Sequence, residues 1–381
     1  MTRRYLPGAT IGLMGSGQLG RMFALAARHM GYRIHVFSPE TDTPAGQVAD
    51  REVSGAYEDE AAVREFAAKL DLLTFEFENI PRQTIDWCAA ECEVRPAGSI
   101  LHTAQNRLRE KDFLFEAGIP VAPYRAVRTA DELREALASI KTPAILKSAA
   151  FGYDGKGQRR IESSDRPEEI WAERPGDELI LEGAIDFDKE VSVIVARGPE
   201  GEMATFPVCE NLHRNHILDI TVVPARVTAA VERSAAELGR AIAEQLELIG
   251  LLAVEMFLQL DGTLLVNELA PRPHNSGHWT IEGCATSQFE QHVRAVCGLP
   301  LGSTQILRPT AMANLLGDEW RAGEPDWVAA LNNPDVHLHL YGKRQPRPRR
   351  KMGHLSALAD SADAAIAAVS KAREALQRGA L

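Results

Sequence analysis

Apolar strands and amphipathic helices alternate through the first hundred residues. Residues 10–14, 33–37 and 72–77 form short apolar runs, while 19–30 and 60–70 repeat apolar side chains at helical spacing. A glycine-rich turn at 15–20 joins the first strand to the first helix. Strands and helices in this order form parallel sheets with right-handed crossovers. The pattern predicts an α/β, Rossmann-like unit.

The pattern changes near residue 100. A charged segment with apolar spacing at 106–114 predicts a helix, which Gly118 closes and the following prolines keep from continuing. A compact subdomain is expected next, with helices at 131–139 and 166–173 and strands at 144–147, 158–161 and 178–182. A strand at 191–196, a long helix at 229–248 and a hairpin follow. The tail from 309 predicts strands at 311–315 and 336–341 and a final helix at 363–378.

The hairpin pairs residues 253–260 with 263–269 around Asp261 and Gly262, a dipeptide that two-residue type I′ turns favour. With these two residues as the loop, Leu260 pairs with Thr263 and Glu255 falls opposite Glu268. Like charges opposite each other destabilise a sheet, and a hard divalent cation such as Mg²⁺ relieves them. The alternative is an edge hairpin with both glutamates in solvent. The loop after the hairpin, residues 270–279, favours function because it gathers an arginine, two histidines and an aromatic side chain.

A second candidate for chemistry follows the strand that ends at Lys147. Three glycines within residues 152–157 allow backbone amides to converge on an anion that Lys147 also reaches. The order of residues is not that of a P-loop, and a flexible hairpin with an incidental lysine is the alternative. Lysine, glycine loop and opposed glutamates together indicate an ATP site without a P-loop.

The turn at 15–20, GSGQLG, matches the dinucleotide pattern, and Glu40 lies where such folds place a ribose-binding acid. A nicotinamide-dependent reductase is therefore a rival hypothesis. The motif alone is weak, because its glycines permit any phosphate or ribose to approach a helix N-terminus.

Composition narrows the classes. The 381 residues suggest two or three domains, and 45% hydrophobic with 25% charged residues is typical of a soluble globular protein. A net charge of -11 argues against nucleic acid as a partner. Five scattered cysteines, no signal peptide and no long apolar segment predict a reduced, cytoplasmic protein that does not enter a membrane.

Four motifs carry a family resemblance: GSGQLGRM at 15–22, TFEFENIP at 74–81, GYDGKGQ at 152–158 and NELAPRPHNSGHWT at 267–280. In this order they resemble the ATP-grasp superfamily and, within it, the N5-carboxyaminoimidazole ribonucleotide synthetase family, over almost the whole chain. The resemblance implies an α/β ATP-grasp fold. Its parts would be a Rossmann-like pre-ATP-grasp domain at 1–100, an ATP-grasp domain at 101–308 with a mobile subdomain at about 119–186, and a small C-terminal domain at 309–381.

The same resemblance implies ATP-dependent carboxylation of 5-aminoimidazole ribonucleotide by bicarbonate through carboxyphosphate, in purine biosynthesis, by a homodimer. ATP would be the cofactor, with Mg²⁺ or alternatively Mn²⁺ held by Glu255 and Glu268. The residues expected to bind the nucleotide are Arg107, Lys147, Gly152, Tyr153, Asp154, Gly155, Lys156, Gly157, Gln158, Glu182, Gly183, Ala184, Ile185, Glu190, His213, Asn267 and Glu268.

Aminoimidazole ribonucleotide needs its own partners, some of them cationic for its phosphate. The resemblance implies Gln18, Leu19, Glu76, Asn275, Ser276, Lys343, Arg350 and Lys351. The residues expected to take part in the chemistry are Arg272, His274, Lys156 and Tyr153. Arg344, Arg347 and Arg349 of the same basic run would belong to a solvated loop.

Two departures from the family pattern stand out. Lys156 replaces an arginine that many members have, and Ala270 stands where other ATP-grasp enzymes often have a metal-binding asparagine. Asn267 could compensate only if a β-bulge turned it toward Glu268. Besides the reductase, two rival hypotheses remain: another ATP-grasp ligase, such as a formate-dependent glycinamide ribonucleotide transformylase, and a catalytically silent nucleotide-binding regulator.

Overall fold

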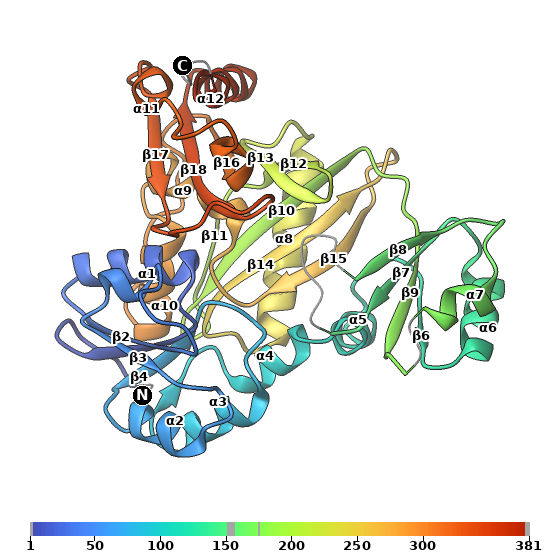
Figure 1. Cartoon of the computed structure of the whole chain (residues 1–381), viewed down its shortest axis with the longest axis horizontal. Helices are drawn as coiled ribbons and strands as arrows, with labels where there is room; N and C mark the ends of the chain where they lie inside the picture. Colours follow the sequence, from blue (N-terminus) through green and yellow to red (C-terminus); the bar gives the residue numbers. More distant parts are fainter. Residues whose placement is uncertain (1–2, 151–156, 174–175, 378–381) are drawn as a thin grey trace.

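Five parallel strands form the sheet of the N-terminal unit, in the order β3-β2-β1-β4-β5. The computed structural model describes residues 3–150, 157–173 and 176–377 (Figure 1). The predicted Rossmann-like order is confirmed. Its elements are β1 (Thr10–Met14), α1 (Gln18–His29), β2 (Arg33–Ser38), the 3₁₀ turn η1 (Gly46–Val48), β3 (Arg51–Ser54), α2 (Glu60–Ala67), β4 (Leu72–Phe75), α3 (Arg82–Ala89) and β5 (Glu93–Val94).

A four-stranded antiparallel sheet, in the order β6-β9-β7-β8, forms a separate lobe with two helices (Figure 1). The helix α5 (Arg107–Glu116) lies between this lobe and the central sheet. The predicted subdomain elements appear, together with one strand, β6, that the sequence analysis did not foresee. The elements are β6 (Tyr124–Val127), α6 (Ala130–Ile140), β7 (Ala144–Ser148), β8 (Gln158–Ile161), α7 (Pro167–Ala172) and β9 (Leu179–Gly183).

The central sheet has nine strands, in the order β15-β14-β10-β12-β13-β16-β18-β17, with β11 paired to β10. Strand β13 pairs with β16, so the strands of the tail continue the sheet that carries the hairpin. The strands are β10 (Lys189–Arg197), β11 (Met203–Thr205), β12 (Cys209–Arg214), β13 (Ile217–Val223), β14 (Gly250–Leu258), β15 (Leu264–Ala270), β16 (Thr310–Leu316), β17 (Val336–Leu340) and β18 (Lys351–Leu358).

The remaining helices cover this sheet and join it to the N-terminal unit. Helix α10 packs against α1, and His292 on it bonds Thr74 of β4 at 3.0 Å. In the part of the chain that the structure describes, no helix is long and apolar enough to cross a membrane. The helices are α4 (Gly98–Ala104), α8 (Ala229–Gln245), α9 (Thr280–Gly283), α10 (Gln288–Cys297), α11 (Trp327–Ala330) and α12 (Ala362–Ala375), with 3₁₀ turns η2 (Asn275–Gly277) and η3 (Gly317–Trp320).

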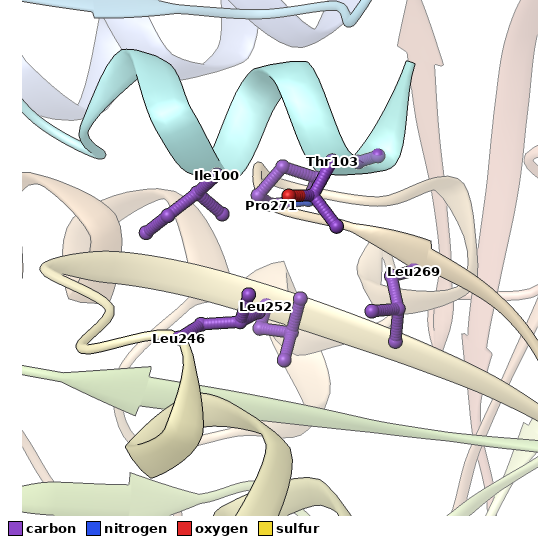
Figure 2. A pocket seen from close by; sticks show the side chains of 7 residues that line it. Ile100, Thr103, Leu246, Leu252, Leu269 and Pro271 are labelled. Atoms are coloured by element: carbon purple, nitrogen blue, oxygen red, sulfur yellow. The ribbon is translucent and has the colours of Figure 1, made fainter. Parts of the chain in front are cut away.

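A small cavity lies between α4 and the strands β14 and β15 (Figure 2). Its lining is almost wholly apolar, with no charged side chain, so it does not suit a nucleotide. Leu269 lines it and follows Glu268, and alternation along a strand sends the two side chains to opposite faces of the sheet. The lining residues are Ile100, Thr103, Ala104, Leu246, Leu252, Leu269 and Pro271.

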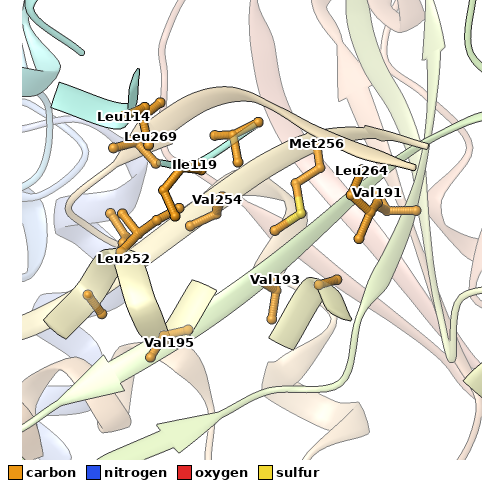
Figure 3. Packing of buried hydrophobic residues seen from close by; sticks show 14 of the residues in the cluster. Leu114, Ile119, Val191, Val193, Val195, Leu252, Val254, Met256, Leu264 and Leu269 are labelled. Atoms are coloured by element: carbon orange, nitrogen blue, oxygen red, sulfur yellow. The ribbon is translucent and has the colours of Figure 1, made fainter. Parts of the chain in front are cut away.

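One face of β10, β14 and β15 packs against α8 in the largest hydrophobic cluster (Figure 3). Alternate residues of each strand, such as Val191, Val193 and Val195, point into it, as the period of a strand requires. Leu114 of α5 and the following Ile119 belong to the same cluster. Burial of these side chains therefore fixes α5 to the sheet that carries the hairpin.

Candidate active site

The hairpin places Glu255 of β14 opposite Glu268 of β15, as the sequence predicted. The predicted turn was wrong. The Gln259 N–H donates to the Thr263 oxygen at 2.9 Å, which leaves a three-residue loop from 260 to 262 that includes the expected partner of Thr263. Gly262 has a φ of 88°, the left-handed conformation that closes such loops.

A β-bulge in β15 restores the expected pairing. Met256 pairs with Val266, whereas Glu255, the residue before Met256, pairs with Glu268. Asn267 is therefore the additional residue of β15. The longer turn and the bulge shift the register in opposite directions and cancel. The bulge that Asn267 needs in order to lie beside Glu268 is therefore present.

The two glutamates differ in their electrostatic surroundings. Burial raises the pKa of Glu255, but a hydrogen bond from His274 and its charge outweigh burial and bring the pKa to about 2. His274 Nε2 lies 3.0 Å from Glu255 Oε1. Burial and the negative charge of Glu255 raise the pKa of Glu268, although Arg107 acts the other way. Glu255 is thus held as an anion, and ionised Glu268 calls for a further cation.

This carboxylate pair fits a magnesium ion. Mg²⁺ is commonly held by one or two carboxylates together with substrate phosphates, whereas a cage made of protein alone needs more ligands. Within the described ranges, no group of three His, Cys, Asp or Glu side chains is arranged to hold a metal. Glu255 and Glu268 would therefore supply two ligands, with the amide of Asn267 beside them.

A buried chain of hydrogen bonds fixes His274. Its Nδ1 accepts from the Ser276 N–H at 3.3 Å and lies 2.9 Å from the Ser276 hydroxyl. Ser192 donates to that hydroxyl at 2.9 Å, and the amide of Asn211 donates to Ser192 at 2.9 Å. These contacts occupy Nδ1, so Nε2 is the ring nitrogen that faces Glu255. His274 is held here as a donor to the carboxylate, and its role as a base stays a prediction.

Arg272 forms an ion pair with Glu78 that joins the hairpin to the N-terminal unit. Arg272 Nε lies 2.5 Å from Glu78 Oε2. Burial lowers the pKa of Arg272, but Glu78, then Glu268 and Glu76, raise it, so the guanidinium stays charged. Arg272 is therefore close to carboxylates from both sides of the site.

On the nucleotide side, cations and anions predicted to bind ATP meet one another. Lys147 of β7 contacts Glu182 of β9 at 2.8 Å, and His213 of β12 contacts Glu190 of β10 at 3.0 Å. Arg107 begins α5, and its guanidinium donates to the Ser148 oxygen at 3.2 Å. The segment after Glu182 continues as Gly183, Ala184 and Ile185, where the Ala184 N–H donates to the Pro143 oxygen at 3.1 Å. Gln158 begins β8 and Gly157 precedes it, whereas Gly152, Tyr153, Asp154, Gly155 and Lys156 lie outside the described residues.

The glycine turn at 15–20 receives a protein carboxylate. Glu76 follows β4 and accepts hydrogen bonds from the N–H groups of Gly17 and Gly20, the latter at 2.8 Å. A Cβ at Gly17 would lie 2.7 Å from Glu76 Oε1, and one at Gly15 would lie 2.6 Å from Glu76 Cγ. The glycines thus admit Glu76 at the start of α1, where a dinucleotide fold would bind pyrophosphate. This arrangement disfavours the nicotinamide interpretation.

The basic segment before β18 faces the same region. Burial raises the pKa of Glu76, while the backbone bonds and then the charges of Arg272 and Lys343 lower it. Lys343 Nζ donates to the Lys351 oxygen at 2.7 Å, and Arg350 donates to the Gln345 oxygen at 3.1 Å. Arg344, expected in a solvated loop, forms an ion pair with Asp42 of the N-terminal unit.

Two of the predicted substrate residues are buried in the loop after β15. The amide side chain of Asn275 exchanges hydrogen bonds with that of Asn314 on β16, at 2.8 and 3.1 Å. Ser276 belongs to the chain that holds His274. Gln18 and Leu19 form the first turn of α1, beside the glycines that bind Glu76. The tail strands thus help to position the loop that carries the predicted chemistry.

Sequence reasoning missed three charged residues around this site: Glu78, Glu110 and Lys111. Glu78 lies two residues after Glu76 in TFEFENIP, and that spacing was a signal that it could accompany Glu76. Glu110 and Lys111 were read as part of a charged helix, yet both are buried beside β15. Charge alone gave no signal of burial there.

This fold and site define an ATP-grasp enzyme. Family models match the chain in succession: the ribonucleotide synthetase preATP-grasp domain over 8–105, the ATP-grasp domain over 112–289 and the phosphoribosylaminoimidazole carboxylase C-terminal domain over 310–368. The chain belongs to the N5-carboxyaminoimidazole ribonucleotide synthase family. The synthase of Bacillus subtilis (strain 168) is 47% identical over 350 residues, covering 92% of this chain and 91% of the relative.

Solved structures agree. The ADP complex of an N5-carboxyaminoimidazole ribonucleotide synthetase has a TM-score of 0.93 and 44% identity, covering 98% of each chain. The Aspergillus clavatus synthase in complex with ADP and 5-aminoimidazole ribonucleotide has a TM-score of 0.88 and 31% identity, covering 97% of this chain and 99% of its own. The ATP-grasp fold, with its preceding and C-terminal domains, is confirmed.

Proposed function

We propose that this chain carboxylates 5-aminoimidazole ribonucleotide with bicarbonate, converting ATP to ADP and phosphate and producing N5-carboxyaminoimidazole ribonucleotide for purine biosynthesis. It is an ATP-dependent carbon–nitrogen ligase. The position of Arg272 is the observation that carries the proposal. The charge of this arginine acts on Glu268, in the carboxylate pair, and on Glu76, at the glycine turn. A reaction that joins a phosphoryl donor to a ribonucleotide needs such a cation between the two sides.

Two steps account for the products. A bicarbonate oxygen attacks the γ-phosphorus of ATP and ADP leaves, which gives carboxyphosphate. The exocyclic amine of the ribonucleotide then attacks the carboxyl carbon, phosphate leaves, and the amine loses a proton. Arg272 is suited to hold bicarbonate and the charge that develops on it, because Glu78 fixes the guanidinium at 2.5 Å.

The remaining proposed roles follow from position and resemblance. Glu255 and Glu268 would hold Mg²⁺, or Mn²⁺ in its place, which when bound neutralises phosphate charge. Arg107 and Lys147 would bind the ATP phosphates, Glu190 would hold the ribose hydroxyls, and His213 would line the nucleotide pocket. His274, with Tyr153 and Lys156 from the glycine loop, would act near the carboxyl donor. Lys343, Arg350 and Lys351 would bind the phosphate of the second substrate, and the N-terminal unit would contribute Gln18, Leu19 and Glu76.

We also propose the domain bounds, the cellular compartment and the oligomeric state. We propose domains at 1–100, 101–308 and 309–381, with the lobe at about 119–186 moving over the nucleotide. We also propose that the protein is a cytoplasmic homodimer, as the family resemblance implies. All five cysteines are free thiols, which agrees with a reducing compartment.

A substrate-dependence assay tests the reaction. Purified protein, ATP, Mg²⁺ and freshly prepared aminoimidazole ribonucleotide are mixed with and without bicarbonate, and ADP and phosphate are followed. We expect ADP release that requires the ribonucleotide and rises with bicarbonate. Release that ignores bicarbonate but responds to formate and glycinamide ribonucleotide would instead identify the transformylase.

A further inference from the structure

Strand β15 lies at the edge of the central sheet, where β14 pairs with one side. On the other side Val266 forms a single parallel bridge to Val121, and its N–H donates to the Pro120 oxygen at 2.8 Å. The rest of this edge would present open backbone groups. Side chains of α5 meet those groups: Lys111 Nζ donates to the Val266 oxygen at 3.0 Å and to the Asn267 oxygen at 2.7 Å. The neighbouring Glu110 accepts the Leu269 N–H at 3.0 Å. Glu110 and Lys111 thus hydrogen-bond to the backbone of β15 on both sides of Glu268.

These contacts coincide with the bulge. Asn267 is the additional residue of β15, and its carbonyl accepts the shorter of the two bonds from Lys111. A bulge leaves backbone groups that no partner strand satisfies, so its conformation depends on other donors. Without the ammonium group of Lys111, the backbone at Val266 and Asn267 would lose two hydrogen bonds that stabilise the register of Glu268.

The charged side chains of Lys111 and Glu110 are both buried, although covering the edge of a strand does not require buried charges. Lys111 is 1% exposed and Glu110 is 2% exposed. Burial lowers the pKa of Lys111, whereas the charges of Glu182 and Glu110 raise it. Burial raises the pKa of Glu110 to about 8, although the charge of Lys111 opposes the shift. Lys111 thus lies among the carboxylates of the nucleotide site.

The first turn of α5 reaches the phosphate side of the site. The Arg107 N–H donates to the Ala149 oxygen at 2.7 Å, just after the strand that carries Lys147. Farther along the helix, Leu114 packs into the same core as Leu269 of β15 (Figure 3). One helix therefore joins the backbone near the predicted phosphate contacts to the backbone of the carboxylate pair.

We propose that Lys111 and Glu110 are positioning residues that hold the bulge of β15 so that Glu268 and Asn267 meet the metal and the nucleotide. The inference rests on the metal role of Glu268 in the proposed function. Lys111 touches neither substrate nor metal in this role. It acts through the backbone of residues 266 and 267.

Metal affinity tests this role without the reaction. Free Mn²⁺ is followed by electron paramagnetic resonance in the presence of saturating ADP, and ADP affinity is measured separately in a chelator by calorimetry. Lys111→Met keeps the length of the side chain and removes its donors. We expect Mn²⁺ binding to weaken about 10- to 100-fold, as for other supports of metal ligands, with ADP affinity in chelator unchanged. Lys111→Arg keeps donors and should recover part of the affinity.

A second pair of variants keeps the test decisive if Lys111→Met does not fold. Glu110→Gln retains an oxygen for the Leu269 N–H, whereas Glu110→Leu removes it, so Mn²⁺ should bind less tightly to the leucine variant than to the glutamine variant. Lys371→Met on the exposed face of α12 is the matched control and should bind like the wild type.

The outcomes separate two failures. Wild-type Mn²⁺ affinity in folded Lys111→Met, or equal affinity in the two Glu110 variants, would overturn the positioning role alone. A wild-type protein that binds ADP but no Mn²⁺ would overturn both this inference and the proposed metal site. Neither result depends on aminoimidazole ribonucleotide or bicarbonate, so an inactive carboxylase would not be mistaken for either.

Discussion

The glycine turn and the β14–β15 hairpin treat buried negative charge in opposite ways. At the glycine turn, Glu76 lies against the N-terminus of α1 and accepts two backbone N–H bonds. At the hairpin, Glu255 and Glu268 face each other, and the protein supplies a short-range partner, His274, to Glu255. At the first site backbone donors of the protein itself meet the carboxylate, whereas the second site calls for an added cation.

The difference explains why the two motifs differ in value for predicting function. A glycine-rich turn before a helix is typical of phosphate binding, but here its amides already have an acceptor within the protein. Opposed glutamates resemble an ordinary exposed edge, yet their surroundings leave charge uncompensated. Two carboxylates held opposite each other after folding are therefore a better indicator of a ligand than the glycine turn is.

The largest effect should come from breaking the hairpin side. Glu268→Gln removes one carboxylate of the proposed metal pair and should lower kcat about 10³-fold, the scale of losing a preorganised electrostatic group. Thermal unfolding without Mg²⁺ should occur at the same or a higher temperature, because burial and Glu255 raise the pKa of Glu268 and its charge opposes folding. Steady-state ADP release and calorimetry measure the two quantities.

The exposed Glu237→Gln on α8 is the control for Glu268→Gln and should behave like the wild type. Turnover near the wild-type rate in Glu268→Gln would remove the metal site from the comparison. A large fall in unfolding temperature would show that the carboxylate has a structural role instead.

The fold was largely predictable because its periodicities are strong. Apolar runs and helical spacing indicated the parallel sheet, the lobe and the hairpin, since burial on one face dictates the period of each element. The continuation of the central sheet from β13 into β16 was not predictable. It depends on pairing between strands that lie far apart in the chain, and no local pattern specifies such a partner.

The site was predictable in part, and one success had an incomplete basis. Glu255 and Glu268 were paired correctly although the turn was wrong, because the bulge at Asn267 compensated for the longer loop. Lys111 was missed because a lysine in a charged helix normally reaches solvent. Only the packing of α5 against the edge of β15 reveals its carbonyl partners.

A moderate effect should come from breaking the glycine-turn side. Glu76→Gln offers one oxygen to two backbone N–H groups and turns its own NH₂ toward one of them. We expect the free energy of unfolding to fall by about 1–3 kcal/mol, the cost of a buried unsatisfied group. Urea titration followed by tryptophan fluorescence measures it.

The exposed Glu58→Gln is the matched control on the same unit. Equal stability of Glu76→Gln and wild type would mean that the carboxylate is not needed to satisfy the turn. Saturable binding of NADH to the wild-type protein would contradict the comparison directly, because a pyrophosphate and Glu76 would compete for the same amides.

The smallest expected effect is a change in the free energy of unfolding with pH, whose sign differs between Glu255 and Glu76. The pKa of Glu255 is lowered from 4.5 to about 2, so its stabilising contribution is present above pH 4.5 and is lost as the pH falls toward 2. Burial raises the pKa of Glu76, so its contribution changes the other way: stability is lost as the pH rises above 4.5 toward the folded-state pKa.

Urea titrations in chelator at pH 7 and pH 4.5 compare each glutamine variant with wild type. From pH 7 to pH 4.5, the excess free energy of unfolding of wild type over Glu255→Gln should shrink by about 0.4 kcal/mol, because the Glu255 carboxyl is half protonated in the unfolded chain at pH 4.5. The excess of wild type over Glu76→Gln should grow. Changes of the same sign would show that the two carboxylates are balanced alike, because opposite signs arise only if His274 outweighs burial at the hairpin and burial prevails at the glycine turn.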